Sequence, residues 1–369
     1  MQVFRYPSGD ALAREAQIRS RSLTYRDEEM SAVAQILKAV QAQKDAAVLE
    51  YTRRFDAPDM TAAEVLVTKE EYAKAQALVT SRFMQALRRA VTQIQEFHRR
   101  QVQNSWMVTD RPGILLGQLV NPVGSAGVYV PGGKGGDTPL VSSVLMGAIP
   151  AKIAGVPRVV MATPPKRDGS VDPHLLVAAQ TVGVDTVYKM GSAWAIAALA
   201  YGTETISPCD VIVGPGNIYV AIAKKLVSGT VGIDMIAGPS EVLVIADESA
   251  VAEYAAADPL SQAEHDPMAS AVLVTPYVHV AEKVAAAVKI QLERLPRKDI
   301  AVASLERFGA AMVVEDLEAA IALANRFAPE HLELQISNPM EVIGQIRNAG
   351  AVFLGNHTPE PVGDYVAGP

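Results

Sequence analysis

Hydrophobic positions in the first hundred residues recur at the spacing of one helix face. From Tyr25 to about Arg100 the apolar side chains follow one another as an amphipathic helix requires. The first run of such positions is Met30, Val33, Leu37, Val40 and Val48. A second segment, "TKEEYAKAQALV", opens at Thr68 with a capping-box pattern. The pattern therefore predicts a mostly helical N-terminal region.

The pattern changes after Arg111, where short β-type runs are separated by glycine and proline. Beyond this point strand-like and helix-like runs alternate, with tight links between them. The predicted strands are 127–130, 158–162, 186–189 and 211–213, and the predicted helices are 141–155, 172–182 and 193–201. Such alternation predicts a parallel sheet that binds ligands beyond the carboxyl ends of its strands. The candidate ligand loops are "VPGGKGGDTP", "ATPPKRDGS", "KMGSAW" and "VGPGN".

A second series of apolar runs begins at Glu241 and predicts another α/β layer. Its strands read "EVLVIAD", "SAVLVTP", "AAMVVED", "LELQI" and "AVFLG". We therefore predict an α/β fold of two Rossmann-like parallel-sheet domains, the second inserted in the first, with a helical N-terminal region. The predicted bounds are 1–24 for an N-terminal arm, 25–127 plus 241–369 for the outer domain, and 128–240 for the inserted domain. The helical region is assigned to the outer domain because it has little sheet of its own.

Composition narrows the class of protein. The chain has 369 residues, 49% of them hydrophobic, and a formal net charge of -7, which offers no basic surface for nucleic acid or anionic lipid. One cysteine, Cys209, excludes an internal disulfide and a cysteine-based metal cage. Neither a secretory signal pattern nor an apolar run long enough to span a membrane occurs. We expect a cytoplasmic α/β enzyme with a small-molecule substrate, no nucleic acid partner and no membrane association.

Two glycine-containing turns follow predicted strands. The loop Pro131–Asp137, "PGGKGGD", could bring backbone N–H groups close to a phosphate, or could be a plain flexible loop. It does not spell a dinucleotide-binding or P-loop motif. Asn217, at the end of "VGPGN", could hydrogen-bond a ribose or cap the next helix. The sequence alone leaves both choices open.

A possible metal site lies in the segment "PLSQAEHDP". Gln262 and His265 are one helical turn apart, so both side chains can converge on one ligand. The alternative is an ordinary polar helix end. A zinc site needs about four N, O or S ligands, and Asp364, in the turn-rich C-terminal segment that also holds His357 and Glu360, would supply a third.

A possible acid/base pair lies in "NRFAPEHLELQI". Alternating Leu332, Leu334 and Ile336 predict a buried strand face, which leaves His331 on the other face with Glu333 and Gln335. Glu330 precedes His331 directly. A carboxylate beside an imidazole at the mouth of a sheet can do general acid/base work, although a structural role for both remains open.

Nine segments together resemble the histidinol dehydrogenase family, in family order from roughly Tyr25 to the last residue. They are "GVYVPGG", "SSVLMGAIPAKIAGV", "ATPP", "IAALAYGT", "VGPGN", "IDMIAGPSEVLVIAD", "LSQAEHDP", "NRFAPEHLEL" and "TPEPVGDYVAGP". The resemblance implies oxidation of L-histidinol through L-histidinaldehyde to L-histidine, with two NAD-dependent hydride transfers. It also implies a homodimer with one Zn²⁺ per subunit.

The resemblance carries functional residues onto this chain. Gln262, His265 and Asp364 match metal ligands that also hold the substrate, and Ser240 matches a substrate contact. The acid/base positions correspond to His331, which takes the alcohol proton, and Glu330, which activates the water that adds to the aldehyde. The cofactor contacts correspond to Tyr129, Trp194 and Asn217. The outer domain would then hold substrate and metal, and the inserted domain NAD.

The sequence departs from the family pattern in two places. Trp194 stands where the family has glutamine, so an indole could stack on the adenine of NAD or block it, and the nearby loop "PGGKGGDTP" is about two residues longer than is usual. The family pattern also continues into a C-terminal tail, swapped between subunits, with one more histidine ligand and a substrate-binding glutamate; these 369 residues do not include it. The alternatives are a paralogue that oxidises a different small alcohol and a non-catalytic paralogue that binds metal or nucleotide.

Overall fold

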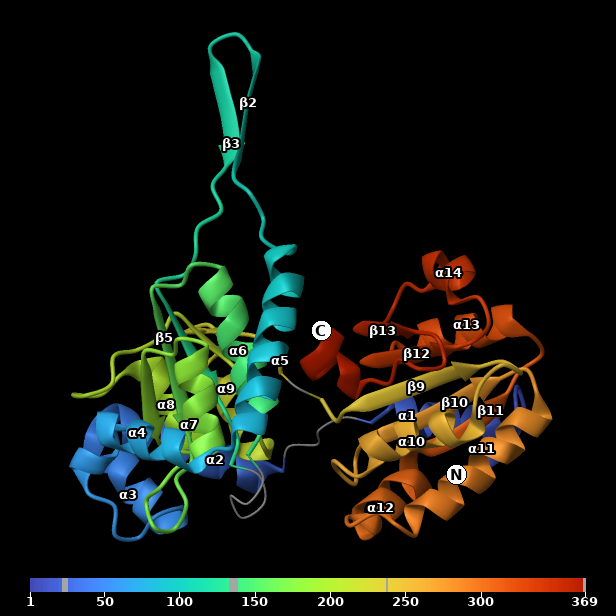
Figure 1. Ribbon diagram of the computed structural model, residues 1–369, viewed down its shortest axis with the longest axis horizontal. Coiled ribbons are helices and arrows are strands. Elements are labelled where there is room, and N and C mark those ends of the chain that lie inside the picture. The colour runs from blue at the N-terminus through green and yellow to red at the C-terminus, as the bar shows by residue number, and fades with distance from the viewer. Residues whose placement is uncertain (22–25, 133–138, 237, 368–369) are drawn as a thin grey trace. The chain divides into compact units, whose positions relative to one another are not determined.

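The protein divides into two compact units, which we describe separately. The computed structural model describes residues 1–21, 26–132, 139–236 and 238–367 (Figure 1). The six-stranded unit consists of Met1–Leu23 and Gly238–Gly363, and the five-stranded unit consists of Thr24–Ala237 and Asp364–Pro369.

The six-stranded unit is built on an all-parallel sheet with the order β1-β11-β10-β9-β12-β13. Its strands are β1 (Val3–Arg5), β9 (Glu241–Ala246), β10 (Ser270–Thr275), β11 (Gly309–Val313), β12 (His331–Gln335) and β13 (Ala351–Leu354). The helices are α1 (Gly9–Arg19), α10 (Ala252–Ala263), α11 (Val278–Leu292), α12 (Lys298–Phe308), α13 (Leu317–Phe327) and α14 (Pro339–Val342), and Ile343–Gln345 forms a 3₁₀ turn. Helices α10, α11 and α12 cover one face of the sheet, and α1 and α13 cover the other.

The five-stranded unit has a second all-parallel sheet with the order β6-β5-β4-β7-β8. Its strands are β4 (Ser125–Tyr129), β5 (Arg158–Thr163), β6 (Thr186–Lys189), β7 (Val211–Val213) and β8 (Gly232–Ile233). The helices are α2 (Asp27–Gln43), α3 (Asp45–Phe55), α4 (Lys69–Leu78), α5 (Ser81–Arg99), α6 (Val141–Ile153), α7 (Pro173–Thr181), α8 (Ser192–Tyr201) and α9 (Ile218–Val227). Helices α2, α3, α8 and α9 pack on one face, and α4 to α7 on the other. Short turns of helix lie at Ala62–Glu64 and Gly363–Ala367.

An antiparallel hairpin extends from the five-stranded unit (Figure 1). It consists of β2 (Trp106–Arg111) and β3 (Ile114–Gln118), which pair with each other and with no strand of either sheet. Every residue of both strands is exposed. Of the β-type runs predicted after Arg111, the first is β3 of this hairpin and the run at 127–130 belongs to β4 of the five-stranded sheet, while β2 precedes the predicted change.

The fold class is confirmed, and the assignment of the N-terminal helices differs from the prediction. Residues 25–127 were predicted to join 241–369, yet α2 to α5 cover the five-stranded sheet, so the insertion spans 24–237 and not 128–240. Val33, Val40 and Val48 pack in one cluster with residues of α8. The arm predicted at 1–24 instead supplies an edge strand and a covering helix to the six-stranded unit. Periodicity predicts which helix face is buried, but it does not specify which sheet covers that face.

Candidate active site

Three chain segments meet at the amino edge of the six-stranded sheet. Ser240 directly precedes β9, His331 is the first residue of β12, and α10 ends just before β10 begins. Because these three strands are parallel and adjacent, the residues before them lie along one edge. The register pairs His331 with Val242, and the Ser270 amide donates to the Ser240 carbonyl at 3.0 Å. The fold therefore brings together the predicted substrate, metal and acid/base segments of this unit.

His331 is held in one tautomer by the main chain. Its Nδ1 lies 3.1 Å from the Glu241 carbonyl oxygen, which can only accept, so Nδ1 carries the proton. In the neutral imidazole the lone pair is then on Nε2, which lies 3.7 Å from Glu360 Oε1. The side chain is partly exposed. An imidazole held in this way can take a proton at Nε2.

Glu241, the first residue of β9, also positions Glu330 beside His331. The Glu241 amide donates to Glu330 Oε2 at 3.3 Å, and this carboxylate oxygen lies 4.0 Å from His331 Nδ1. The carboxylate is about half exposed, so it can reach water. Its main-chain oxygen accepts from the Ala351 amide, and a Cβ at Gly350 would approach that oxygen to 2.7 Å. Glycine at position 350 thus allows β13 to begin against this segment.

The predicted strand face on β12 is confirmed, but the opposite face is buried as well. Leu332, Leu334 and Ile336 are buried, and Glu333 and Gln335 are 0% and 2% exposed. Gln335 Nε2 donates to Glu333 Oε2 at 2.8 Å and to Asp258 Oδ2 at 2.6 Å. Burial raises the pKa of both carboxyl groups, and their proximity raises that of Glu333 further.

Glu333 also fixes the C-terminal turn next to His331. Its Oε1 accepts from the Glu360 amide at 3.0 Å. This bond places the Glu360 carboxylate near His331 Nε2. The sequence reasoning noted Glu360 only as part of a polar turn and did not include it or Glu241 among the site residues. The only available signal was the position of Glu360 four residues before Asp364.

Two of the candidate zinc ligands, Gln262 and His265, lie at the end of α10. Gln262 is 4% exposed, and no side-chain hydrogen bond joins its amide to another residue that the structure describes. His265 is exposed, and its carbonyl accepts from Arg297 Nη2 at 3.2 Å. An unpartnered amide oxygen and an imidazole are both ligand types that zinc accepts. The side chain of Asp364 lies outside the described residues, so the full ligand set stays a prediction.

The loops at the carboxyl ends of the five-stranded sheet form the second predicted site. Asn217 caps α9, with Oδ1 accepting from the Tyr219 and Val220 amides at 3.1 and 3.2 Å, so the capping role is confirmed. Gly214 has φ +116°, and a Cβ there would lie 2.1 Å from the Tyr129 carbonyl oxygen. "VGPGN" therefore presses against the end of β4, as only glycine permits. Most of the loop Pro131–Asp137 lies outside the described residues.

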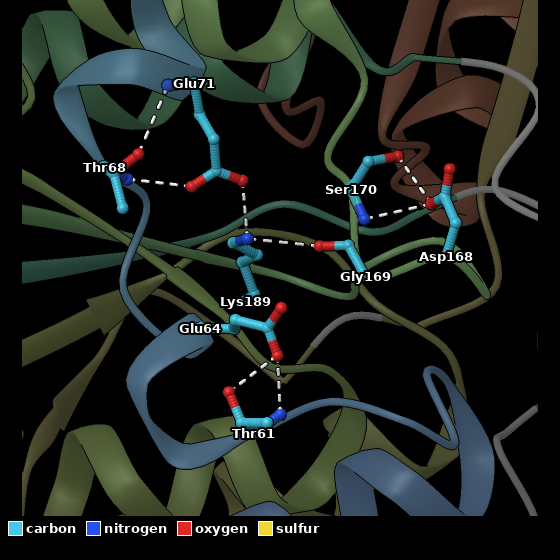
Figure 2. Close-up of polar contacts among 8 residues, drawn as sticks. All are labelled: Thr61, Glu64, Thr68, Glu71, Asp168, Gly169, Ser170 and Lys189. Carbon is cyan, nitrogen blue, oxygen red and sulfur yellow. Dashed lines mark hydrogen bonds and ion pairs between the residues drawn. The ribbon is translucent and has the colours of Figure 1, made fainter.

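A buried lysine at the end of β6 joins two of the predicted ligand loops (Figure 2). Lys189 Nζ donates to Glu71 Oε1 at 2.5 Å and to the Gly169 carbonyl at 3.1 Å. The other oxygen of Glu71 accepts from the Thr68 amide at 2.8 Å, which completes the predicted capping box of α4. The lysine thus fixes the loop after β5 and the start of α4 against the end of β6.

Tyr129 and Trp194 lie in the core of the five-stranded unit. Tyr129 is buried, and its hydroxyl oxygen accepts from the Ser192 amide at 2.9 Å. Trp194 is 4% exposed, and its Nε1 donates to Thr52 Oγ1 at 3.0 Å. Its indole stacks on Tyr51 and Phe55, with ring centroids 5.9 and 5.6 Å apart. The exposed ring of this group is Phe55, at 57%.

A carboxyl group missed by the sequence reasoning lies close to the same loops. Asp56 Oδ2 is buried, and it has no hydrogen-bond partner within the described part of the chain. Burial raises the pKa of Asp56 to about 7. A Cβ at Gly191 would lie 3.0 Å from this oxygen, which places the carboxyl group beside "KMGSAW".

Two helix-covered parallel sheets, one of which carries the candidate residues Gln262, His265, Glu330 and His331, are typical of a two-unit α/β enzyme. The family profile described as histidinol dehydrogenase matches residues 19–369. The chain therefore belongs to the histidinol dehydrogenase family, a family of oxidoreductases. Among the described residues, no helix is long and apolar enough to cross a membrane.

Individual relatives agree with this assignment. The histidinol dehydrogenase of Desulfotalea psychrophila is 57% identical over 339 residues, which is 92% of this chain and 78% of that protein. That of Bacillus subtilis is 52% identical over 343 residues, 93% of this chain and 79% of that protein. A crystal structure of histidinol dehydrogenase from Elizabethkingia anophelis aligns with a TM-score of 0.93 at 38% identity, covering 100% of this chain and 83% of that one.

Proposed function

We propose that the protein oxidises L-histidinol to L-histidine through L-histidinaldehyde, with NAD accepting a hydride in each of two steps. The observation that carries the proposal is His331, whose Nδ1 is fixed on the Glu241 carbonyl so that Nε2 is the basic nitrogen. Membership of the histidinol dehydrogenase family supports the substrate.

In the first step His331 Nε2 takes the hydroxyl proton while a hydride leaves the alcohol carbon for NAD. Water then adds to the aldehyde while Glu330 takes one proton of that water, which leaves a gem-diol with one hydroxyl ionised. A second hydride leaves this gem-diolate for a second NAD, and the carboxylic acid that results releases its proton to become the carboxylate. The Glu360 carboxylate, 3.7 Å from Nε2, stabilises the imidazolium that forms at His331.

Zinc binding is proposed for Gln262, His265 and Asp364. Burial and the lack of a described partner for the Gln262 amide support this ligand set, as does the exposed His265 imidazole one helical turn away. When bound, the metal would hold the substrate through its imidazole and amine. Ser240, at the start of β9, is proposed as a further substrate contact.

NAD is proposed to bind at the carboxyl ends of β4, β6 and β7, where Tyr129, Trp194 and Asn217 lie. Because Trp194 is buried, the ring available to stack on adenine is Phe55, and the indole supports it from the other side. Asn217 uses Oδ1 to cap α9, which leaves its Nδ2 group to donate to a ribose.

NADH formation from L-histidinol, with zinc and NAD present, tests the proposed function. We expect two NADH per histidinol consumed and histidine as the product, because the aldehyde is oxidised in the same site. Turnover of other small alcohols without turnover of histidinol would favour the paralogue with a different substrate. Tight zinc binding without any turnover would favour the non-catalytic paralogue.

We also propose a homodimer, supported by the exposed hairpin and, through the family resemblance, by swapped C-terminal tails. The apolar side chains of the hairpin are exposed on both of its faces, and two strands alone are marginally stable in water. Light scattering should give the mass of a dimer for the wild-type protein. Met107→Glu combined with Leu116→Glu should shift it toward the monomer, whereas Thr109→Glu on the same hairpin should shift it less. A wild-type monomer would refute the dimer.

A further inference from the structure

Arg21, near the end of the N-terminal segment, is buried in the six-stranded unit. Its side chain is 1% exposed, and its Nη2 donates to Glu241 Oε1. The guanidinium carbon also lies 5.4 Å from the centroid of the Phe308 ring. Its Nε and Nη1 are buried without hydrogen-bond partners in the described part of the chain. Among the described residues, the guanidinium is therefore oriented by the ion pair with Glu241 and by the Phe308 ring.

The main chain of Glu241 contacts both members of the proposed acid/base pair. Its carbonyl oxygen accepts from His331 Nδ1 at 3.1 Å, and its amide donates to Glu330 Oε2 at 3.3 Å. Glu241 is the first residue of β9 and pairs with Ser270 of β10. The ion pair with Arg21 adds a constraint on its side chain to the constraint that strand pairing places on its main chain.

This ion pair is poorly explained as a stabilising contact. Burial lowers the pKa of Arg21 and raises the pKa of Glu241, and the attraction between the two groups opposes both shifts. The Arg21 side chain is 1% exposed and that of Glu241 is 32% exposed, so the cost of desolvation falls mainly on the guanidinium. Two guanidinium nitrogens without partners among the described residues add to that cost. The pair is therefore better explained by the position it gives to Glu241 than by a gain in stability.

We infer that Arg21 is a positioning residue, which acts through Glu241 to hold His331 and Glu330 in their working orientation; the catalytic part of this inference rests on the proposed function. Arg21 precedes Glu241 by 220 residues in the chain, so the sequence gives no local indication of this contact. A small displacement of a catalytic group is sufficient to slow a reaction strongly.

Kinetics of the full chain, loaded with zinc, test the inference. Arg21→Met should lower kcat about 30-fold in both oxidation steps, with the KM for histidinol within about twofold of the wild-type value. Arg21→Lys should restore part of kcat, because it retains the charge. The double variant Arg21→Met with Glu241→Gln should retain a larger fraction of kcat than the product of the fractions retained by the two single variants, because each single variant leaves one charge without its partner and the double variant removes both. Arg19→Met is the matched control, since Arg19 is 51% exposed and pairs with Glu15.

A second measurement does not depend on turnover. With ¹⁵N-labelled histidine, the His331 ring, assigned by its loss in His331→Gln, should report the Nδ1–H tautomer in the wild-type protein. Arg21→Met should give a mixture of tautomers while the protein stays folded and binds zinc. An unchanged tautomer in Arg21→Met would overturn the inference. An increase in KM with no decrease in kcat would also overturn it, and so would a loss of activity that is explained entirely by a smaller fraction of folded protein. Failure of wild-type turnover, by contrast, would count against the proposed function alone.

Discussion

His331→Ala is expected to lower the rate of the first oxidation about 10³-fold, within the range for loss of a general base. The reason is geometric: the Glu241 carbonyl fixes the proton on Nδ1, so Nε2 is the nitrogen available to take the hydroxyl proton. Histidinol oxidation and histidinaldehyde oxidation should be measured separately, each by NADH formation in single-turnover experiments. The KM for histidinol should change much less than kcat.

Glu330→Gln should affect the aldehyde step most. The Glu330 carboxylate is half exposed and can reach the attacking water, and glutamine preserves its shape while removing its basicity. We expect the second oxidation to fall about 10²-fold and the first to fall much less. His279→Ala is the control, because His279 is exposed and pairs with Glu248 at 3.5 Å. Equal losses in both half-reactions for either variant would refute this division of roles.

The sequence predicted elements well because their local patterns are complete within a few residues. Alternation in "LELQI" predicted β12 and its buried face, and both were confirmed. The same alternation predicted that Glu333 and Gln335 occupy the other face, but not that this face is buried. Their burial depends on Asp258 and on the turn at Glu360, which approach from other parts of the chain.

The helices of the N-terminal region illustrate the same limit at the level of domains. The helical period identified the apolar face of α2, but the residues that cover it come from α8 and α9, far along the chain. The periodicity of a helix is a local signal. It does not identify the distant elements that pack against the helix.

Residue type indicated the candidate site residues whose side chains carry chemical groups, but not the residue that contacts them through its main chain. Gln262, His265, Glu330 and His331 are chemically conspicuous residue types, and they lie at the end of α10 and the start of β12. Glu241 contacts His331 and Glu330 through its carbonyl and amide groups, which every residue has, so its residue type does not indicate these contacts. Arg21 is hidden for a related reason, because its partner is more than 200 residues away.

Trp194→Gln is expected to destabilise the five-stranded unit by about 3 to 5 kcal/mol, the usual cost of removing a large buried aromatic side chain. The indole is 4% exposed, stacks on Tyr51 and Phe55, and donates to a buried hydroxyl of Thr52. Glutamine would leave a cavity there and would place an amide among apolar side chains. Chemical denaturation of the wild-type and variant proteins measures the difference.

NAD binding to the same variant decides what the indole does for the cofactor. If Trp194 supports the exposed ring of Phe55, Trp194→Gln should weaken NAD binding severalfold, and Phe55→Ala should weaken it by a similar factor while costing less stability. Thr52→Val separates the hydrogen bond from the stack, because it leaves the indole N–H unpaired at a cost of about 1 to 3 kcal/mol. Tighter NAD binding by Trp194→Gln would instead identify the indole as an obstruction. An unchanged dissociation constant would exclude both roles and leave Trp194 as a core residue alone.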